Sequence, residues 1–128
     1  MNGSIQQRLC VVLAAATVVL VGCTRLTSIK SDLVLEVDSG ARIVLHQRTQ
    51  AIEVNNDSSG TVRVRVLGKR DRVVTDMLLN SHDQVRLDLE TAQAVQFNND
   101  GVDTTTIRWR LENDNLIEYS LAMTPANR

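Results

Sequence analysis

Aromatic residues are scarce in this sequence, and so are charges gathered in blocks of one sign. Phe97, Trp109 and Tyr119 are the only aromatic residues, which argues against sugar-binding and base-stacking surfaces because those surfaces work through exposed rings. The formal net charge is -1, with no block of like charge, which argues against nucleic acid as a partner. The single proline, Pro125, lies beyond the last predicted strand and ends the domain.

The N-terminal residues are typical of an export signal. Arg8 contributes positive charge, and Leu9 to Leu20 form an apolar run that is shorter than the roughly 20 residues needed to span a bilayer. The stretch that follows, Leu20-Val21-Gly22-Cys23, resembles the lipobox of bacterial lipoprotein precursors. The resemblance implies cleavage between Gly22 and Cys23, a diacylglycerol thioether on Cys23, and N-acylation of the new terminus by a fatty acid such as palmitate. An ordinary cleaved signal with a chance cysteine, or an uncleaved anchor, are the alternatives.

This processing would define the organisation of the chain. Residues 1–22 are predicted to be the removed signal peptide, 23–32 a lipid anchor and short tether, 33–123 a single domain, and 124–128 a C-terminal tail. Cys10 would leave with the signal and the remaining cysteine would carry lipid. The domain would then have no disulfide, no free thiol and no cysteine-based metal site, and would be held together by packing alone.

Thr24 follows the predicted lipid-bearing cysteine. In lipoproteins of the enterobacterial type, an aspartate at this position retains the protein at the inner membrane. The resemblance therefore implies a lipid-anchored location in the cell envelope, at the outer membrane facing the periplasm if the organism is Gram-negative.

From residue 33 onward, apolar and polar residues alternate. Such alternation predicts strands with one buried and one wet face, and clusters of Asn, Asp, Ser and Gly between the runs predict the turns of an antiparallel sheet. The alternating apolar positions are Leu33, Leu35, Val37; Ile43, Leu45; Ile52, Val54; Val62, Val64, Val66; Val85, Leu87, Leu89; Val95, Phe97; Ile107, Trp109, Leu111; and Ile117, Tyr119, Leu121.

An internal repeat is the most informative feature of residues 33–123. The segment 49–57 (TQAIEVNND) recurs at 91–100 (TAQAVQFNND) with one residue inserted, and 61–66 (TVRVRV) recurs at 106–111 (TIRWRL). The period is about 43 residues, as in the recurrence of Asn56 at Asn99. Two antiparallel hairpins would share alternation by chance, but not both the Asn-Asn-Asp turn and the Arg-x-Arg spacing.

These patterns predict an all-β fold, an antiparallel β-sandwich or partly closed barrel of 8–9 strands built from two pseudo-symmetric repeats. Two repeats of this length are too few to close a propeller, but two four-strand units facing each other as two sheets would form a sandwich.

Catalytic patterns are few. Ser81-His82-Asp83 contains the residue types of a hydrolase triad, but three consecutive residues in one turn do not converge as a triad requires. The other histidine, His46, is predicted to face outward. The sequence therefore predicts no enzyme and no catalytic residue, with a hydrolase as the alternative.

Two further groups of residues are candidate binding sites. Asp100 and Asp103 lie in an oxygen-rich loop that suits calcium, but the loop lacks the spacing of a calcium-binding motif, and Asn and Asp are ordinary turn residues. No resident metal or cofactor is therefore predicted, apart from the covalent lipid on Cys23. Two outward Arg-x-Arg pairs could bind anions, or could be neutralised by neighbouring carboxylates; these are Arg63, Arg65, Arg108 and Arg110.

The function predicted from the sequence is that of a non-catalytic, membrane-anchored envelope lipoprotein, a protein-binding or accessory module of an envelope assembly. Its partners would be the membrane, through the lipid anchor, and an envelope protein whose identity the sequence does not indicate. The alternative is a lipoprotein that captures an anionic lipid or cell-wall group on the outward arginines.

Overall fold

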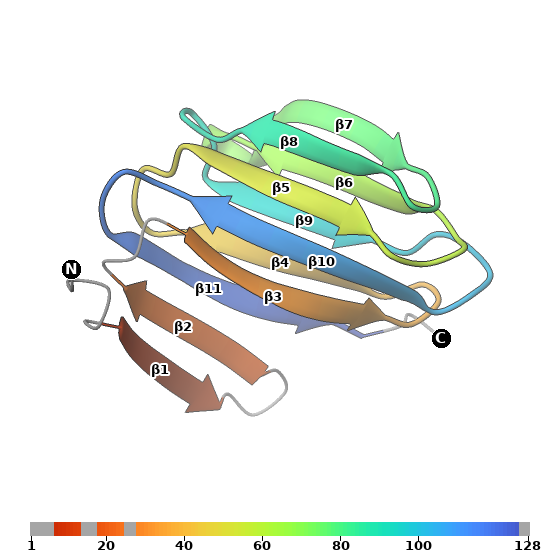
Figure 1. The fold of residues 1–128 in the computed structure, drawn as a ribbon, viewed down its shortest axis with the longest axis horizontal. Helices are drawn as coiled ribbons and strands as arrows, with labels where there is room; N and C mark the ends of the chain where they lie inside the picture. The colour runs from red at the N-terminus through yellow and green to blue at the C-terminus, as the bar shows by residue number, and fades with distance from the viewer. Residues whose placement is uncertain (1–6, 14–17, 25–27, 126–128) are drawn as a thin grey trace.

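The computed structural model describes residues 7–13, 18–24 and 28–125, and it is built from antiparallel strands (Figure 1). One sheet has the strand order β1-β2-β11-β4-β9-β6-β7, and the other has the order β3-β10-β5-β8. The strands are β1 (Gln7–Leu13), β2 (Val18–Thr24), β3 (Ser28–Leu35), β4 (Gly40–Leu45), β5 (Ala51–Asn56), β6 (Val62–Leu67), β7 (Val73–Leu79), β8 (Gln84–Asp88), β9 (Ala94–Asn98), β10 (Thr105–Glu112) and β11 (Ile117–Thr124).

From β3 onward the nine strands form a sandwich of a four-stranded and a five-stranded layer, which confirms the predicted fold class. The chain passes from one layer to the other at every turn after β3 except the β6–β7 turn, so the other neighbours within the sandwich are distant in sequence (Figure 1). This double-sheet winding is the jelly-roll arrangement. The arrangement of the repeats differs from the prediction that each four-strand repeat would form one of the two sheets. Each sheet takes strands from both repeats in alternation, and neither repeat forms a sheet by itself.

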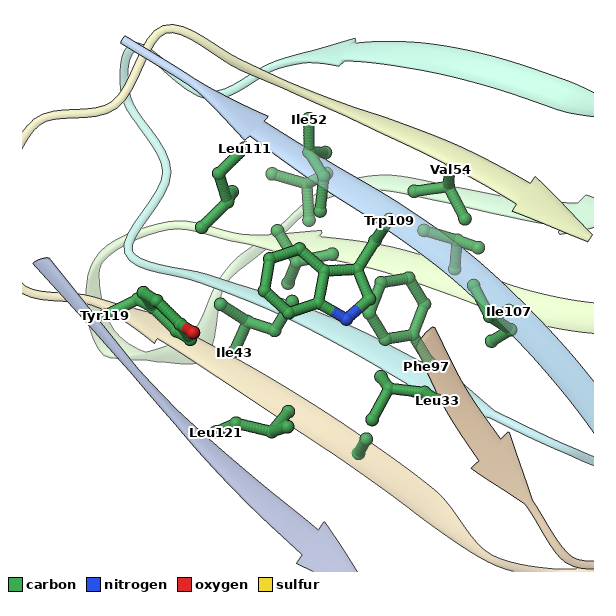
Figure 2. Close-up of a cluster of buried hydrophobic side chains, with 14 of the residues drawn as sticks. Leu33, Ile43, Ile52, Val54, Phe97, Ile107, Trp109, Leu111, Tyr119 and Leu121 are labelled. Carbon is green, nitrogen blue, oxygen red and sulfur yellow. The ribbon is translucent and has the colours of Figure 1, made fainter. Parts of the chain in front are cut away.

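The space between the layers is filled by the alternating apolar side chains (Figure 2). Trp109 of β10 is 1% exposed, and its ring meets that of Tyr119 edge-on, with centroids 5.6 Å apart at 77°. This is a favourable geometry for two aromatic rings. Burial of Val64 and Trp109 places Arg63, Arg65, Arg108 and Arg110 on the outer faces, as the alternation predicted.

Strand pairing reproduces the sequence repeat. Val54 of β5 pairs with Trp109 of β10, and its repeat counterpart Phe97 of β9 pairs with Val64 of β6. The pair Ile52 and Leu87 likewise corresponds to Val95 and Ile43. The two repeats are therefore related by a pseudo-two-fold exchange of the layers, in which β3 corresponds in space to β7, β4 to β8, β5 to β9 and β6 to β10. Among the described strands, β11 has no counterpart beside β8.

The buried residues Asn56 and Asn99 show the duplication at the level of single hydrogen bonds. Asn56 Nδ2 donates to the carbonyls of Gly60 and Leu79, at 2.7 and 3.1 Å, and Asn99 Nδ2 donates to those of Asp103 and Leu35, at 2.8 and 2.9 Å. Each side-chain oxygen accepts the backbone N–H two residues ahead, at 3.0 Å. The shared Asn-Asn-Asp motif therefore exists because one buried asparagine closes each loop.

β1 and β2 form a hairpin that extends the five-stranded layer by pairing β2 with β11 (Figure 1). Cys23 lies in β2, opposite Arg8 and Glu118. Parts of the predicted signal peptide (1–6 and 14–17), tether (25–27) and tail (126–128) lie outside the described residues. β3 begins at Ser28, inside the segment predicted as a tether. Processing at the lipobox and lipidation of Cys23 stay predictions. No helix among the described residues has the length and apolarity needed to cross a membrane.

β7 is a strand that alternation did not predict. Its residues Val73 and Val74 are consecutive, as are Met77, Leu78 and Leu79, so the apolar positions have no period of two. β7 lies at the end of its sheet and pairs with β6 alone among the described strands. Much of both faces of β7 is therefore exposed to solvent.

Candidate functional site

A groove of about 730 Å³ lies at one end of the sandwich, where three loops meet. We call it the end groove; it is lined by residues 47–50 of the β4–β5 loop, Glu90 of the β8–β9 loop, and residues 113–116 of the β10–β11 loop. Smaller hollows of about 370 and 320 Å³ share Gln50 with it. The volume falls within the range of about 300 to 1,000 Å³ that is usual for small-molecule sites.

Side-chain hydrogen bonds hold the loops of the end groove together. Asn113 Nδ2 donates to the carbonyls of Arg48 and Leu116, at 2.8 and 3.0 Å. Gln50 Nε2 donates to Asp114 Oδ2 at 2.7 Å, while the Gln50 backbone N–H donates to the Glu112 carbonyl at 3.1 Å. The walls of the groove are thus fixed by amides that bridge different loops.

Two opposite charges at the groove remain loosely paired. Arg48 Nη2 lies 3.8 Å from Glu90 Oε2, and their side chains are 77% and 57% exposed. That separation is too long for a hydrogen bond, and an exposed pair of this kind contributes only about 0 to 1 kcal/mol. A ligand could therefore replace the pairing at small cost.

Tighter ion pairs border the groove. Glu112 binds both Arg86 and Arg110, and Arg110 also lies 2.8 Å from Glu53. The hydrogen bond from Arg86, aided by the positive charges of Arg86 and Arg110, lowers the pKa of Glu112 against the opposing effect of burial. These charges are satisfied within the protein, unlike the loose Arg48–Glu90 pair.

The end groove lies where the two repeats differ. The pseudo-two-fold relation places the β6–β7 loop at the position corresponding to residues 113–116 of the groove wall. That loop folds into a tight turn in which Arg70 and Asp71 have φ of 58° and 59°, and Arg72 N–H donates to the Lys69 carbonyl at 3.2 Å. Positive φ at both central residues, Arg70 and Asp71, defines this turn as type I′. The groove wall formed by residues 113–116 therefore has no equivalent in the first repeat.

The predicted arginine candidates do not converge. Arg63 and Arg65 lie on the outer face of one sheet, and both contact Asp76, at 2.9 and 3.5 Å. Arg108 and Arg110 lie on the outer face of the other sheet, where Arg108 is 3.2 Å from Asp32. Each arginine is neutralised on its own face, so the four form no common anion site.

The other candidates from the sequence are also separate. Asp100 lies 3.6 Å from Arg63, while Asp103 contributes its backbone carbonyl to the buried Asn99. Ser81 Oγ donates to the Ser58 carbonyl at 2.6 Å, and His82 has φ of 62° in its turn. His46 Nε2 lies 3.0 Å from Ser120 Oγ on an exposed face.

Sequence reasoning did not identify the groove residues, because they come from loops far apart in the chain. One pattern in the sequence pointed toward them. The repeat is close from residue 49 to 66 and from 91 to 111, and becomes loose where residues 113–116 begin to differ from the β6–β7 loop.

Comparisons with known proteins identify the fold and no family. No family model matches the chain, and no curated protein matches it in sequence. PirA has a similar structure, with a TM-score of 0.53 and 13% identity over 65% of this chain and 93% of PirA. Bacillus subtilis oxalate decarboxylase OxdC aligns with a TM-score of 0.55 and 10% identity over 84% of this chain. The chain spans 29% of the oxalate decarboxylase. These similarities support the jelly-roll fold.

The comparison corrects the function predicted from the sequence. The fold is shared with part of oxalate decarboxylase, an enzyme, and does not support a non-catalytic membrane-anchored accessory lipoprotein of the envelope. That prediction is wrong. The alternative was capture of an anionic lipid or cell-wall group on the outward arginines. The structure does not support it, because the arginines lie on two different faces and already form ion pairs.

Oxalate decarboxylase has Mn(II) centres, but the interior of this fold differs from a metal site. The buried side chains between the layers are apolar, and the buried polar residues are Ser39, Thr49, Asn56, Asn99 and Thr105. Among the described residues, His, Cys, Asp and Glu do not gather in a group of three that could hold a metal. The side chains that the structure describes in the interior therefore do not fit a manganese ion.

Proposed function

We propose that this jelly-roll domain binds a small zwitterionic ligand, such as a free amino acid, in the end groove. The observation that carries the proposal is the loose pair of Arg48 and Glu90 at the groove, with 3.8 Å between Nη2 and Oε2. A ligand that offers a carboxylate to the guanidinium and an ammonium to the carboxylate would replace one weak pair with two charge-assisted contacts.

The remaining lining suits such a ligand. Gln47, Gln50 and Asn115 supply amides that both donate and accept hydrogen bonds, and Leu116 supplies an apolar surface for an aliphatic part. The Thr49 hydroxyl is buried and donates to the Gln47 carbonyl at 3.0 Å, so it is engaged within its own loop. The lining thus provides groups that can recognise both charges and the aliphatic part of such a ligand.

Isothermal titration calorimetry of the full chain with glycine, glutamine, leucine and lysine tests the proposal. Arg48→Gln and Glu90→Gln should each weaken binding by about tenfold or more, because each removes one charge-assisted contact. Arg72→Gln changes an exposed arginine at the same end of the sandwich and should leave the affinity unchanged. It is the matched control.

Blocked ligands separate the two contacts. N-acetylglycine lacks the ammonium group and glycinamide lacks the carboxylate, so both should bind more weakly than glycine. Equal binding of glycine and its blocked forms, or full affinity in Arg48→Gln, would contradict the proposal.

A further inference from the structure

Exposed large apolar side chains of the described residues are concentrated on one strand. Val73, Val74 and Leu78 of β7 are 51%, 54% and 52% exposed, and the other two such residues, Val34 and Val102, lie elsewhere in the fold. β7 is at the end of its sheet and pairs with β6 alone among the described strands, so its outer backbone groups have no ladder partner there. Among the described strands, β7 is therefore an unpaired edge with exposed apolar side chains. Figure 1 shows its position at the end of the sheet.

The duplication supplies an internal comparison for this edge. β3 is the spatial counterpart of β7 and also ends its sheet, but it exposes Lys30, Ser31 and Asp32. β8 ends the same sheet on the other side and exposes Gln84, Arg86 and Asp88. Charged and polar residues are the usual protection of a sheet edge against further pairing. β7 has a single charged residue, Asp76, which Arg63 and Arg65 neutralise, and it exposes three large apolar side chains where β3 exposes one.

The charge next to the β7 edge indicates what would bind it. Lys69, Arg70 and Arg72 are exposed in the turn that leads into β7, and none forms an ion pair with another described residue. Asp71, between them, is 3.4 Å from Arg42, and Asp76 within β7 is held by Arg63 and Arg65. The turn therefore presents uncompensated positive charge at one end of an apolar edge.

We propose that the β7 edge accepts an extended peptide segment as an added strand, with aliphatic side chains against Val74 and Leu78 and carboxylates beside Arg70 and Arg72. Backbone hydrogen bonds of strand addition supply affinity, and alternate side chains supply selectivity. The occupant is an acidic, aliphatic peptide. A second copy paired in parallel would place two positive turns side by side, and an antiparallel second copy is the competing occupant that the test below distinguishes.

The test uses the full chain and a fluorescein-labelled, end-blocked peptide, Thr-Val-Thr-Val-Thr-Val-Glu-Glu, followed by fluorescence anisotropy. The double variant V74T/L78T should weaken binding about tenfold or more, because it removes the aliphatic contact. R70Q/R72Q should also weaken binding and reduce its sensitivity to salt, and a peptide with Gln in place of both Glu should show the same effect. Circular dichroism should show both variants folded, since the changed side chains are exposed.

V34T is the matched control. Val34 is 58% exposed on β3 and precedes the buried Leu35, as Leu78 precedes the buried Leu79 on β7. Its replacement should leave peptide binding unchanged. Hydrogen exchange gives an independent measure: alternate β7 amides should become protected when the peptide is bound.

Three results would overturn the proposal: unchanged affinity in V74T/L78T, an equal loss in V34T, or no new protection of β7 amides. Concentration-dependent dimers that V74T/L78T abolishes would also overturn it, and would assign the edge to a second copy. Arg48→Gln should bind the peptide normally, so failure here is distinguishable from failure of the end-groove proposal.

Discussion

Replacing the buried asparagines Asn56 and Asn99 tests whether the two repeats are equivalent in energy as well as in geometry. Each side chain makes three hydrogen bonds, two from Nδ2 to backbone carbonyls and one to Oδ1 from a backbone N–H. A hydrogen bond contributes about 1 kcal/mol net, so Asn56→Ala and Asn99→Ala should each lower the free energy of unfolding by about 3 kcal/mol. The loss is large against a typical stability of roughly 5 to 15 kcal/mol.

Urea denaturation followed by tryptophan fluorescence measures this loss, because Trp109 is the only tryptophan and is buried. With a denaturant slope of about 1 to 3 kcal/mol per molar, each midpoint should fall by about 1 to 3 M. Asn55→Ala, one position earlier in the motif and partly exposed, should shift stability by less than about 0.5 kcal/mol. A loss below about 1 kcal/mol in one asparagine variant beside a large loss in the other would refute the equivalence.

Two further predictions concern the core and the pH dependence of stability. Val64→Asp and Trp109→Asp should each prevent folding, seen as loss of cooperative unfolding, because both sites are fully buried and an unpaired buried charge costs several kcal/mol. A folded Trp109→Asp protein would contradict the assigned faces. The hydrogen bond from Arg63 lowers the pKa of Asp76 below its ordinary value of 3.8, so the ionised carboxylate stabilises the fold above that pH and the gain is lost as the pH falls through the lowered pKa. Asp76→Asn should therefore lose less stability than the wild type between neutral pH and about pH 2, measured by urea unfolding at each pH; an equal loss would contradict this assignment.

The sequence predicted most of the sandwich, because one face of each inner strand is buried and the other is wet. Alternation at 62–66 and 107–111 correctly placed Val64 and Trp109 inside and the arginines between them outside. The repeat could also be predicted from the sequence, because the Asn-Asn-Asp motif contains the buried asparagine that closes each loop. Local burial leaves a local pattern in the sequence.

β7 was not predicted because its environment leaves no such pattern. As an edge strand with apolar residues at consecutive positions, it has no period of two. Its position in space beside β6, corresponding to that of β3 beside β10, depends on a pairing between distant strands. The same exception to the alternation is what makes this edge a candidate for strand addition.

The end groove could not be predicted for a related reason. Arg48, Glu90 and Asn113 come from three loops, and only the folded chain brings them together. In the sequence, Arg48, Glu90 and Asn113 are each typical of ordinary polar residues in turns or on the surface. The loose Arg48–Glu90 pair, on which the proposed function rests, is a tertiary distance with no local signature.

A crystal structure of the full chain grown with the amino acid that binds most tightly in calorimetry tests the proposed function most directly. We predict the ligand in the end groove, with its carboxylate within hydrogen-bonding distance of Arg48 and its ammonium group against Glu90. A ligand bound on an outer face of the sandwich, or a groove ligand that contacts neither charge, would contradict the account.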